Sequence, residues 1–138
     1  MGRAAGIDIS KYQVTFDPSK ATEPIDFIIQ RASWGMYQDE LFNELYQGVK
    51  NILARGAYHY YSSNIPWKDQ ADLFLRISSG KGFKVLVVDY EEGYNKLTKR
   101  TALELASFLS YLKDKRPNKK IVGYSNTYTY RDFINPYV

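Results

Sequence analysis

The amino-acid sequence predicts an α/β fold with a parallel sheet or barrel. Short apolar runs alternate along the chain with longer stretches of helical periodicity, which is the pattern of successive βα units. The 138 residues are 44% hydrophobic and 25% charged, a content that fits one domain with a single core over residues 1–138. No glycine-rich phosphate loop of the GxGxxG or GxxxxGK[ST] type follows any expected strand, which argues against nucleotide binding.

The N-terminal half contains three expected strands and one helix. Gly6–Ser10 alternates isoleucine with polar residues, and Phe27–Ala32 is a β-branched run typical of a strand buried on both faces. From Glu40 to Ala54 apolar residues recur every three or four positions, which predicts an amphipathic helix with Asp39 as its N-cap. Ala57–Tyr61 is the third expected strand.

The C-terminal half continues the alternation. A helix is expected over Trp67–Ile77, and Lys84–Asp89 is the clearest buried strand of the chain. Thr98 opens the next helix, which must stop before Pro117 because a residue that precedes proline avoids the helical conformation. A fifth strand over Ile121–Ser125 and a short helical piece around residues 128–134 complete the order.

Composition excludes several kinds of chemistry. The chain has no cysteine and one histidine, so it cannot form disulfides, thiolate sites or a multi-histidine metal site by itself. A net charge of +4 favours anionic partners without identifying one, and the absence of a long basic block argues against a nucleic-acid tail. The chain also lacks an apolar run of membrane-spanning length and a secretory signal at its start, so neither a membrane span nor self-directed export is expected.

Three carboxylates follow expected strands. Asp8 lies on the first strand, and Asp89 and Glu91 lie at the end of the fourth. Residues two apart in an extended segment point the same way, so Asp89 and Glu91 should project together. Two close carboxylates do not both ionise freely, and the pair can supply an acid and a base, as glycoside hydrolysis requires. The alternative is that these side chains are caps or surface charges.

Further polar and aromatic side chains fall on or beside the ends of the expected strands. Tyrosine and tryptophan rings there suit a groove for a polar, ring-shaped ligand such as a sugar, although an aromatic-rich core would account for the same composition. His59 should point to the opposite face from its tyrosine neighbours, toward the helices, and we interpret it as structural. The candidate substrate-binding residues are Arg31, Trp34, Tyr58, Tyr60 and Tyr124.

Several segments, taken in order and spacing, carry a family resemblance. They are Gly6-Ile7-Asp8-Ile9-Ser10 with Tyr12-Gln13, Asp26-Phe27 with Ile29–Ser33, Arg55-Gly56-Ala57-Tyr58-His59-Tyr60, Gln70-Ala71 with Phe74, Val87-Val88-Asp89-Tyr90-Glu91, and Gly123-Tyr124-Ser125. With these motifs the chain resembles glycoside hydrolase family 25, the Chalaropsis-type lysozymes common among bacteriophage endolysins.

The resemblance implies a TIM-like (β/α) partial barrel and a lysozyme activity. The enzyme would hydrolyse β-1,4 bonds between N-acetylmuramic acid and N-acetylglucosamine in bacterial peptidoglycan, with net retention and without metal or cofactor. Glu91 would be the general acid/base and Asp89 either the nucleophile or the group that orients the substrate's acetamido group, while Asp8 would tune the pair and hold the sugar. The groove would be lined by Tyr58, Tyr60 and Tyr124, with Arg31 as a further member.

One departure from the family pattern concerns length. Family members complete their barrel with further strands and an acidic residue near their C-terminus, and this sequence stops after about five βα units. Open strand edges would then need a cover, which a second copy or a partner chain could supply. The alternative function is therefore that of a catalytically impaired fragment, or of a non-catalytic cell-wall-binding or assembly relative that needs a partner chain to complete the barrel. A further alternative is a surface on which the tyrosines bind protein. An endolysin of this type would be made in the host cytoplasm and reach the wall after holin-type release or other export.

Overall fold

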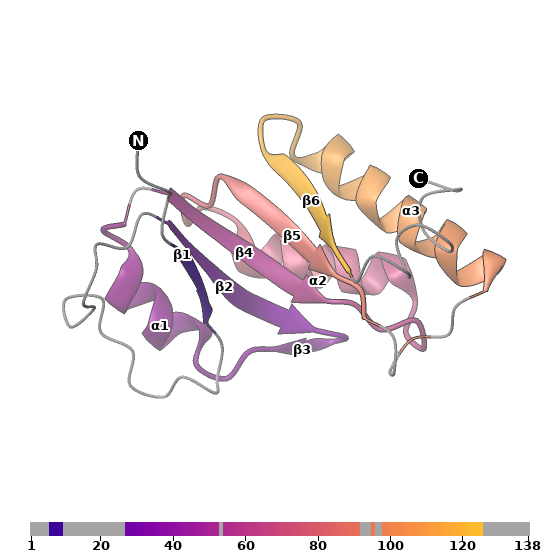
Figure 1. Ribbon diagram of the computed structural model, residues 1–138, viewed down its shortest axis with the longest axis horizontal. Coiled ribbons are helices and arrows are strands. Elements are labelled where there is room, and N and C mark those ends of the chain that lie inside the picture. Colours follow the sequence, from indigo (N-terminus) through magenta and orange to yellow (C-terminus); the bar gives the residue numbers. More distant parts are fainter. Residues whose placement is uncertain (1–5, 10–26, 53, 92–94, 96–97, 126–138) are drawn as a thin grey trace.

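Five parallel strands in the order β1-β2-β4-β5-β6 form the sheet of the protein, and a short strand, β3, pairs antiparallel with β2 (Figure 1). The computed structural model describes residues 6–9, 27–52, 54–91, 95 and 98–125, with only the backbone described for 6–9. The elements are β1 (Gly6–Ile9), β2 (Phe27–Trp34), β3 (Tyr37–Gln38), α1 (Phe42–Val49), β4 (Ala54–Tyr60), α2 (Trp67–Ser78), β5 (Val85–Asp89), α3 (Lys99–Lys115) and β6 (Lys120–Tyr124).

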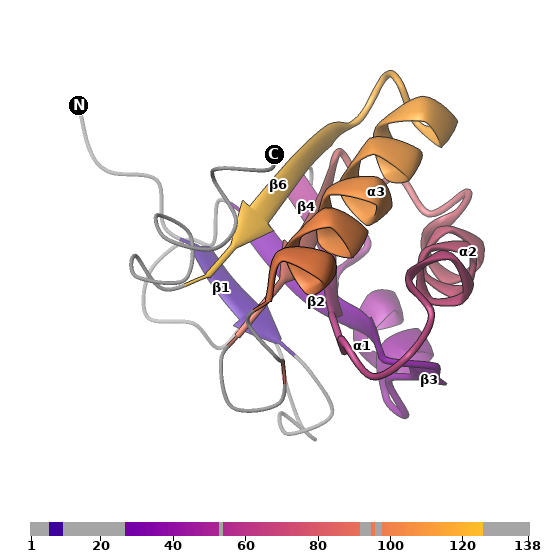
Figure 2. The ribbon, with the colours of Figure 1, turned by 90° about the vertical axis from the view of Figure 1, so that its right-hand side faces the viewer.

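The connections are successive βα units, as predicted. A helix follows each of β2, β4 and β5, and the next parallel strand then adds to the same edge of the sheet. Within the described residues, α1, α2 and α3 lie on one side of the sheet (Figure 2), and the alternate side chains of the strands point to the other side. This one-sided α/β arrangement confirms the predicted fold class.

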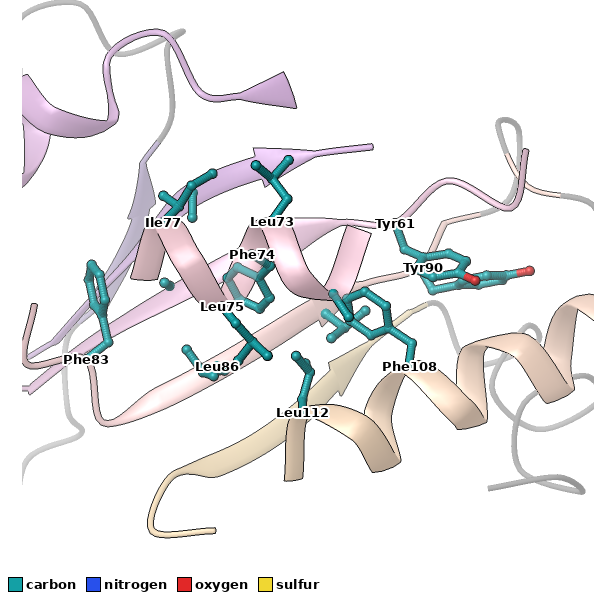
Figure 3. Packing of buried hydrophobic residues seen from close by; sticks show 14 of the residues in the cluster. Tyr61, Leu73, Phe74, Leu75, Ile77, Phe83, Leu86, Tyr90, Phe108 and Leu112 are labelled. Carbon is teal, nitrogen blue, oxygen red and sulfur yellow. The ribbon is translucent and has the colours of Figure 1, made fainter. Parts of the chain in front are cut away.

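The core fills the space between the sheet and its helices. Alternate residues of β4 and β5, such as Ala57, Leu86 and Val88, are buried in one cluster with Phe74 of α2 and Phe108 of α3. Figure 3 shows Leu86, Phe74 and Phe108 in this cluster. Each large side chain that is fully buried in this way contributes roughly 1.5–3 kcal/mol relative to an exposed one. A smaller cluster joins Ile28 of β2 to the inner face of α1.

The first helix differs from the prediction over Glu40–Ala54. It spans only Phe42–Val49, because Asp39 does not occupy the N-cap position. Asp39 instead forms a turn before the helix, in which its carboxylate accepts from the Leu41 N–H at 3.0 Å and its carbonyl accepts from the Phe42 N–H at 3.1 Å. The helix ends at Val49, whose carbonyl accepts from the Ile52 N–H in a closing turn.

The later elements agree with their predictions to within a few residues. Thr98 is the N-cap of α3 as expected, and it exchanges hydrogen bonds with Thr101 in a capping box. Strand β4 begins at Ala54, earlier than predicted, because residues 54–56 also pair with β2. The helical piece expected around residues 128–134 lies outside the described residues. Within the described part of the chain, no helix combines the length and apolar character of a membrane span.

Candidate active site

The C-terminal ends of the strands bring four of the predicted site residues into one row. Trp34 of β2 pairs with Tyr60 of β4, Tyr60 pairs with Asp89 of β5, and Asp89 pairs with Tyr124 of β6. Adjacent paired residues in a sheet project on the same side. Because neighbours such as His59 and Val88 are buried on the helix side, this row faces away from α1, α2 and α3.

A second row lies two residues closer to the N-terminal ends of the strands. Arg31 of β2 pairs with Tyr58 of β4, so both belong to the same face as Tyr60 and Asp89. The backbone of Asp8 in β1 lies opposite Ile29, which precedes Arg31 by two positions on β2. The predicted tyrosine and arginine positions are thus brought together with Asp89.

Arg31 forms a buried ion pair that the sequence analysis did not anticipate. Its Nε donates to Asp39 Oδ2 at 2.8 Å, and the two side chains are 10% and 0% exposed. Asp39 reaches this position through the β2–β3 hairpin, in which the Asp39 N–H donates to the Ala32 carbonyl. One N–H group of the guanidinium is therefore hydrogen-bonded to Asp39, and this ion pair fixes the orientation of the Arg31 side chain on the site face.

A pair of exposed aromatic rings extends the row formed by Trp34, Tyr60, Asp89 and Tyr124. Gly35 adopts φ 52°, which allows a tight turn between β2 and β3 and returns Tyr37 beside Trp34. The two rings lie 4.9 Å apart, and Trp34 and Tyr37 are 40% and 61% exposed. Sequence reasoning missed Tyr37, although the glycine two residues before it is a turn signal.

Glu91 comes just after the last residue of the strand ladder. The Tyr61 N–H donates to the Asp89 carbonyl and the Tyr90 N–H to the Tyr124 carbonyl, which extends the ladder past the ends of β4 and β5. Tyr90 is buried against the helix side, and Glu91 is half-buried. Its backbone carbonyl accepts a hydrogen bond of 2.8 Å from the side-chain amide of Asn95.

His59 is a structural residue, as predicted. It is fully buried between the rings of Phe74 and Phe108, and its Nδ1 and Nε2 lie 2.7 Å from Ser33 Oγ and 2.9 Å from Gln70 Oε1. Burial lowers the pKa of the imidazole to about 4, against a weaker upward effect of the Gln70 hydrogen bond. The ring is therefore neutral near pH 7 and lies on the opposite face of the sheet from Asp89.

The described part of this face offers carboxylate and aromatic groups. Among the described residues there is no group of three or more histidine, cysteine or acidic side chains placed to hold a metal ion. A carboxylate at the centre of an aromatic row, with a second carboxylate two residues on, is suited to acid/base chemistry on a sugar.

The family is decided by sequence. Residues 7–138 match the family described as glycosyl hydrolases family 25. The chain belongs to this family. Its assignment agrees with the resemblance carried by the motifs around Asp8, Tyr58 and Asp89.

The chain is also similar in sequence to individual curated proteins. The chain is 30% identical over 141 residues to uncharacterized protein YegX of Escherichia coli O6:H1, with 96% of this chain and 52% of that protein covered. It is 27% identical over 133 residues to an autolytic lysozyme of Clostridium acetobutylicum, with 94% and 40% covered. The chain spans about half the length of the curated relatives that it matches.

Solved structures share the fold. The catalytic domain of endolysin ply40 from bacteriophage P40 of Listeria monocytogenes has a TM-score of 0.83 at 22% identity, over 98% of this chain and 69% of that one. A family 25 glycosyl hydrolase from Bacillus anthracis also gives 0.83, at 23% identity over 96% and 64%. The sheet and its helices are thus a TIM-like partial barrel of the family 25 type.

Proposed function

We propose that this protein is a family 25 muramidase that cleaves the glycan strands of bacterial peptidoglycan. The observation that carries the proposal is the position of Asp89, which lies between Tyr60 and Tyr124 on the face of the sheet opposite the helices and precedes Glu91 by two residues. Family membership supports the glycoside hydrolase chemistry, and solved structures of similar fold include an endolysin catalytic domain.

In the proposed reaction Glu91 is the general acid/base. Its proton passes to the glycosidic oxygen as the bond to the anomeric carbon breaks, and the same carboxylate then takes a proton from the attacking water. Asp89 stabilises the positive charge that develops at the anomeric carbon, either by bonding to that carbon or by orienting the substrate's own acetamido oxygen to do so. Asp8 would assist this pair and contact the sugar. The bond cleaved would be the β-1,4 link from N-acetylmuramic acid to N-acetylglucosamine.

The rows of side chains beside Asp89 would bind the glycan. Tyr58, Tyr60 and Tyr124 offer ring faces for the apolar faces of sugars and hydroxyls for their polar edges. Trp34 would stack a sugar ring further along the row, and Arg31, oriented by Asp39, would donate to sugar oxygens. The chemistry requires no cofactor, and the same row would serve an endolysin made inside the host and released to the wall.

The type of bond cleaved is tested by labelling the new ends. Purified peptidoglycan is incubated with the protein, reduced with borohydride and hydrolysed, and the reduced amino sugars are identified by mass spectrometry. Appearance of muramicitol supports a muramidase, whereas glucosaminitol would mean that the neighbouring bond is cut. A folded protein that sediments with peptidoglycan without releasing new ends would contradict the proposal and favour a non-catalytic wall-binding role. Light scattering on the same sample gives the oligomeric state.

A further inference from the structure

One buried amide connects the end of β4 to the backbone of Glu91. Asn95 is 8% exposed, and its Nδ2 donates to the Glu91 carbonyl at 2.8 Å and to the Tyr61 carbonyl at 3.1 Å. Its Oδ1 accepts from the Ser63 N–H at 2.6 Å. Only one orientation of the amide satisfies these three contacts, because the carbonyls need the NH₂ group and the Ser63 N–H needs the oxygen.

These hydrogen bonds act where the sheet ladder stops. The main-chain bonds from Tyr61 to Asp89 and from Tyr90 to Tyr124 still hold residues 89 and 90 to both neighbouring strands. At Glu91 the main-chain carbonyl accepts a hydrogen bond from the side chain of Asn95. The Asn95 side chain thus hydrogen-bonds to the main chain of Glu91, which lies just beyond the paired strands and whose side chain is proposed to carry the proton.

We propose that Asn95 is a positioning residue for Glu91, because its side chain holds the Glu91 backbone to the β4–α2 connection. The proposal rests on the proposed acid/base role of Glu91. A general acid works only within hydrogen-bond reach of the leaving oxygen, so a small displacement of its backbone reduces the rate of proton transfer. Asn95 itself touches main-chain atoms and is not assigned contact with the sugar.

The test compares Asn95→Ala and Asn95→Asp with Asn64→Ala, which removes an exposed asparagine from the nearby loop before α2. The aspartate variant retains an oxygen for the Ser63 N–H but loses both donors, including the one to Glu91. For both Asn95 variants we expect kcat on peptidoglycan to fall by about 10- to 100-fold, with KM changed by less than about twofold. Asn64→Ala should match the wild-type protein.

The second readout is the dependence on the leaving group, which a merely structural defect does not change. An aryl β-glycoside of the disaccharide N-acetylglucosaminyl-β-1,4-N-acetylmuramic acid with an acidic phenol as leaving group needs little help from an acid, whereas a sugar leaving group needs a full proton transfer. Asn95→Ala and Glu91→Gln should therefore both lose more activity on glycan than on the aryl substrate. Circular dichroism and thermal unfolding identify variants that remain folded at the assay temperature.

The outcomes separate this inference from the proposed function. If Glu91→Gln shows the selective loss and folded Asn95 variants keep full kcat, or lose activity equally on both substrates, Asn95 does not position the acid. If Glu91→Gln itself retains activity on glycan, the acid/base role fails and the inference fails with it. A selective loss in all three variants supports both.

Discussion

The Nε2 of His59 lies 2.9 Å from the Oε1 of Gln70, and this contact assigns the proton of the imidazole. Gln70 Oε1 is identified as the oxygen because it also accepts from the Ser62 N–H, while Gln70 Nε2 donates to the carbonyls of Ser62 and Ile65. His59 therefore donates through Nε2, and its Nδ1 accepts from the Ser33 hydroxyl. The network joins β2, β4 and the start of α2 behind the site.

The neutral imidazole predicts how His59 titrates. His59 is the one histidine of the chain, so its ring protons give a single resolved pair of NMR signals. Burial lowers the pKa to about 4, and the signals should show no midpoint between pH 5 and 8. A midpoint near the ordinary value of about 6.5 would mean that the ring is accessible to water and that the network is wrong.

The same shift predicts a loss of stability in acid. Between the unfolded pKa of about 6.5 and the folded value of about 4, the unfolded chain binds a proton that the folded protein does not, so stability falls as the pH falls through this window. The full effect is about 3 kcal/mol at pH 4. Urea titrations at several pH values should show this slope in the wild-type protein and a smaller slope in His59→Gln, whose side chain does not titrate. Parallel pH profiles would contradict the prediction.

The Arg31–Asp39 ion pair predicts a strong effect of a single truncation. Asp39→Ala leaves a buried guanidinium without its carboxylate, which should lower the free energy of unfolding by about 3 kcal/mol. The matched control is Asp72→Ala, which breaks an exposed ion pair with Lys68 and an exposed hydrogen bond from the Tyr111 hydroxyl and should change stability little. Equal effects of the two substitutions in chemical denaturation would show that the buried pair does not constrain Arg31.

Substitution of Tyr124 should weaken glycan binding without lowering the stability of the fold. Its side chain is 61% exposed next to Asp89, so Tyr124→Ala should leave the unfolding temperature nearly unchanged. Loss of a sugar-stacking ring should raise KM for soluble glycan fragments by about 5- to 10-fold, or roughly 1 kcal/mol. Leu103→Ala on the outer face of α3, where the side chain is 46% exposed, is the control. An unchanged KM in Tyr124→Ala would remove this residue from the groove.

The sequence predicts the elements that periodicity controls. The buried run that became β5 and the capped helix α3 are found within one or two residues of their expected ends, because local pattern and packing agree there. The row of Tyr60, Asp89 and Tyr124 also follows from strand alternation once the strands are parallel. These positions depend on rules that act over a few residues.

Contacts that depend on tertiary placement could not be predicted in this way. The sequence pattern predicts Asp39 as a helix N-cap. Its ion pair with Arg31 depends on the tight turn at Gly35, which folds β3 back onto β2. Asn95 lies more than thirty positions from Tyr61 and Ser63, and no local pattern distinguishes it from a loop asparagine. Sequence alone therefore gives the candidate carboxylates, and the contacts of Asp39 and Asn95 come from the tertiary structure.

Glu91 is the proposed acid of the reaction, and one substitution tests this role most directly. Release of reducing ends from purified peptidoglycan is measured for the wild-type protein, for Glu91→Gln and for Glu44→Gln, an exposed acidic residue of α1. The glutamine at position 91 keeps the shape of the side chain but has no transferable proton, so kcat should fall by about 100- to 10,000-fold while Glu44→Gln retains full activity. Wild-type rates in Glu91→Gln would contradict the assignment of Glu91 as the acid.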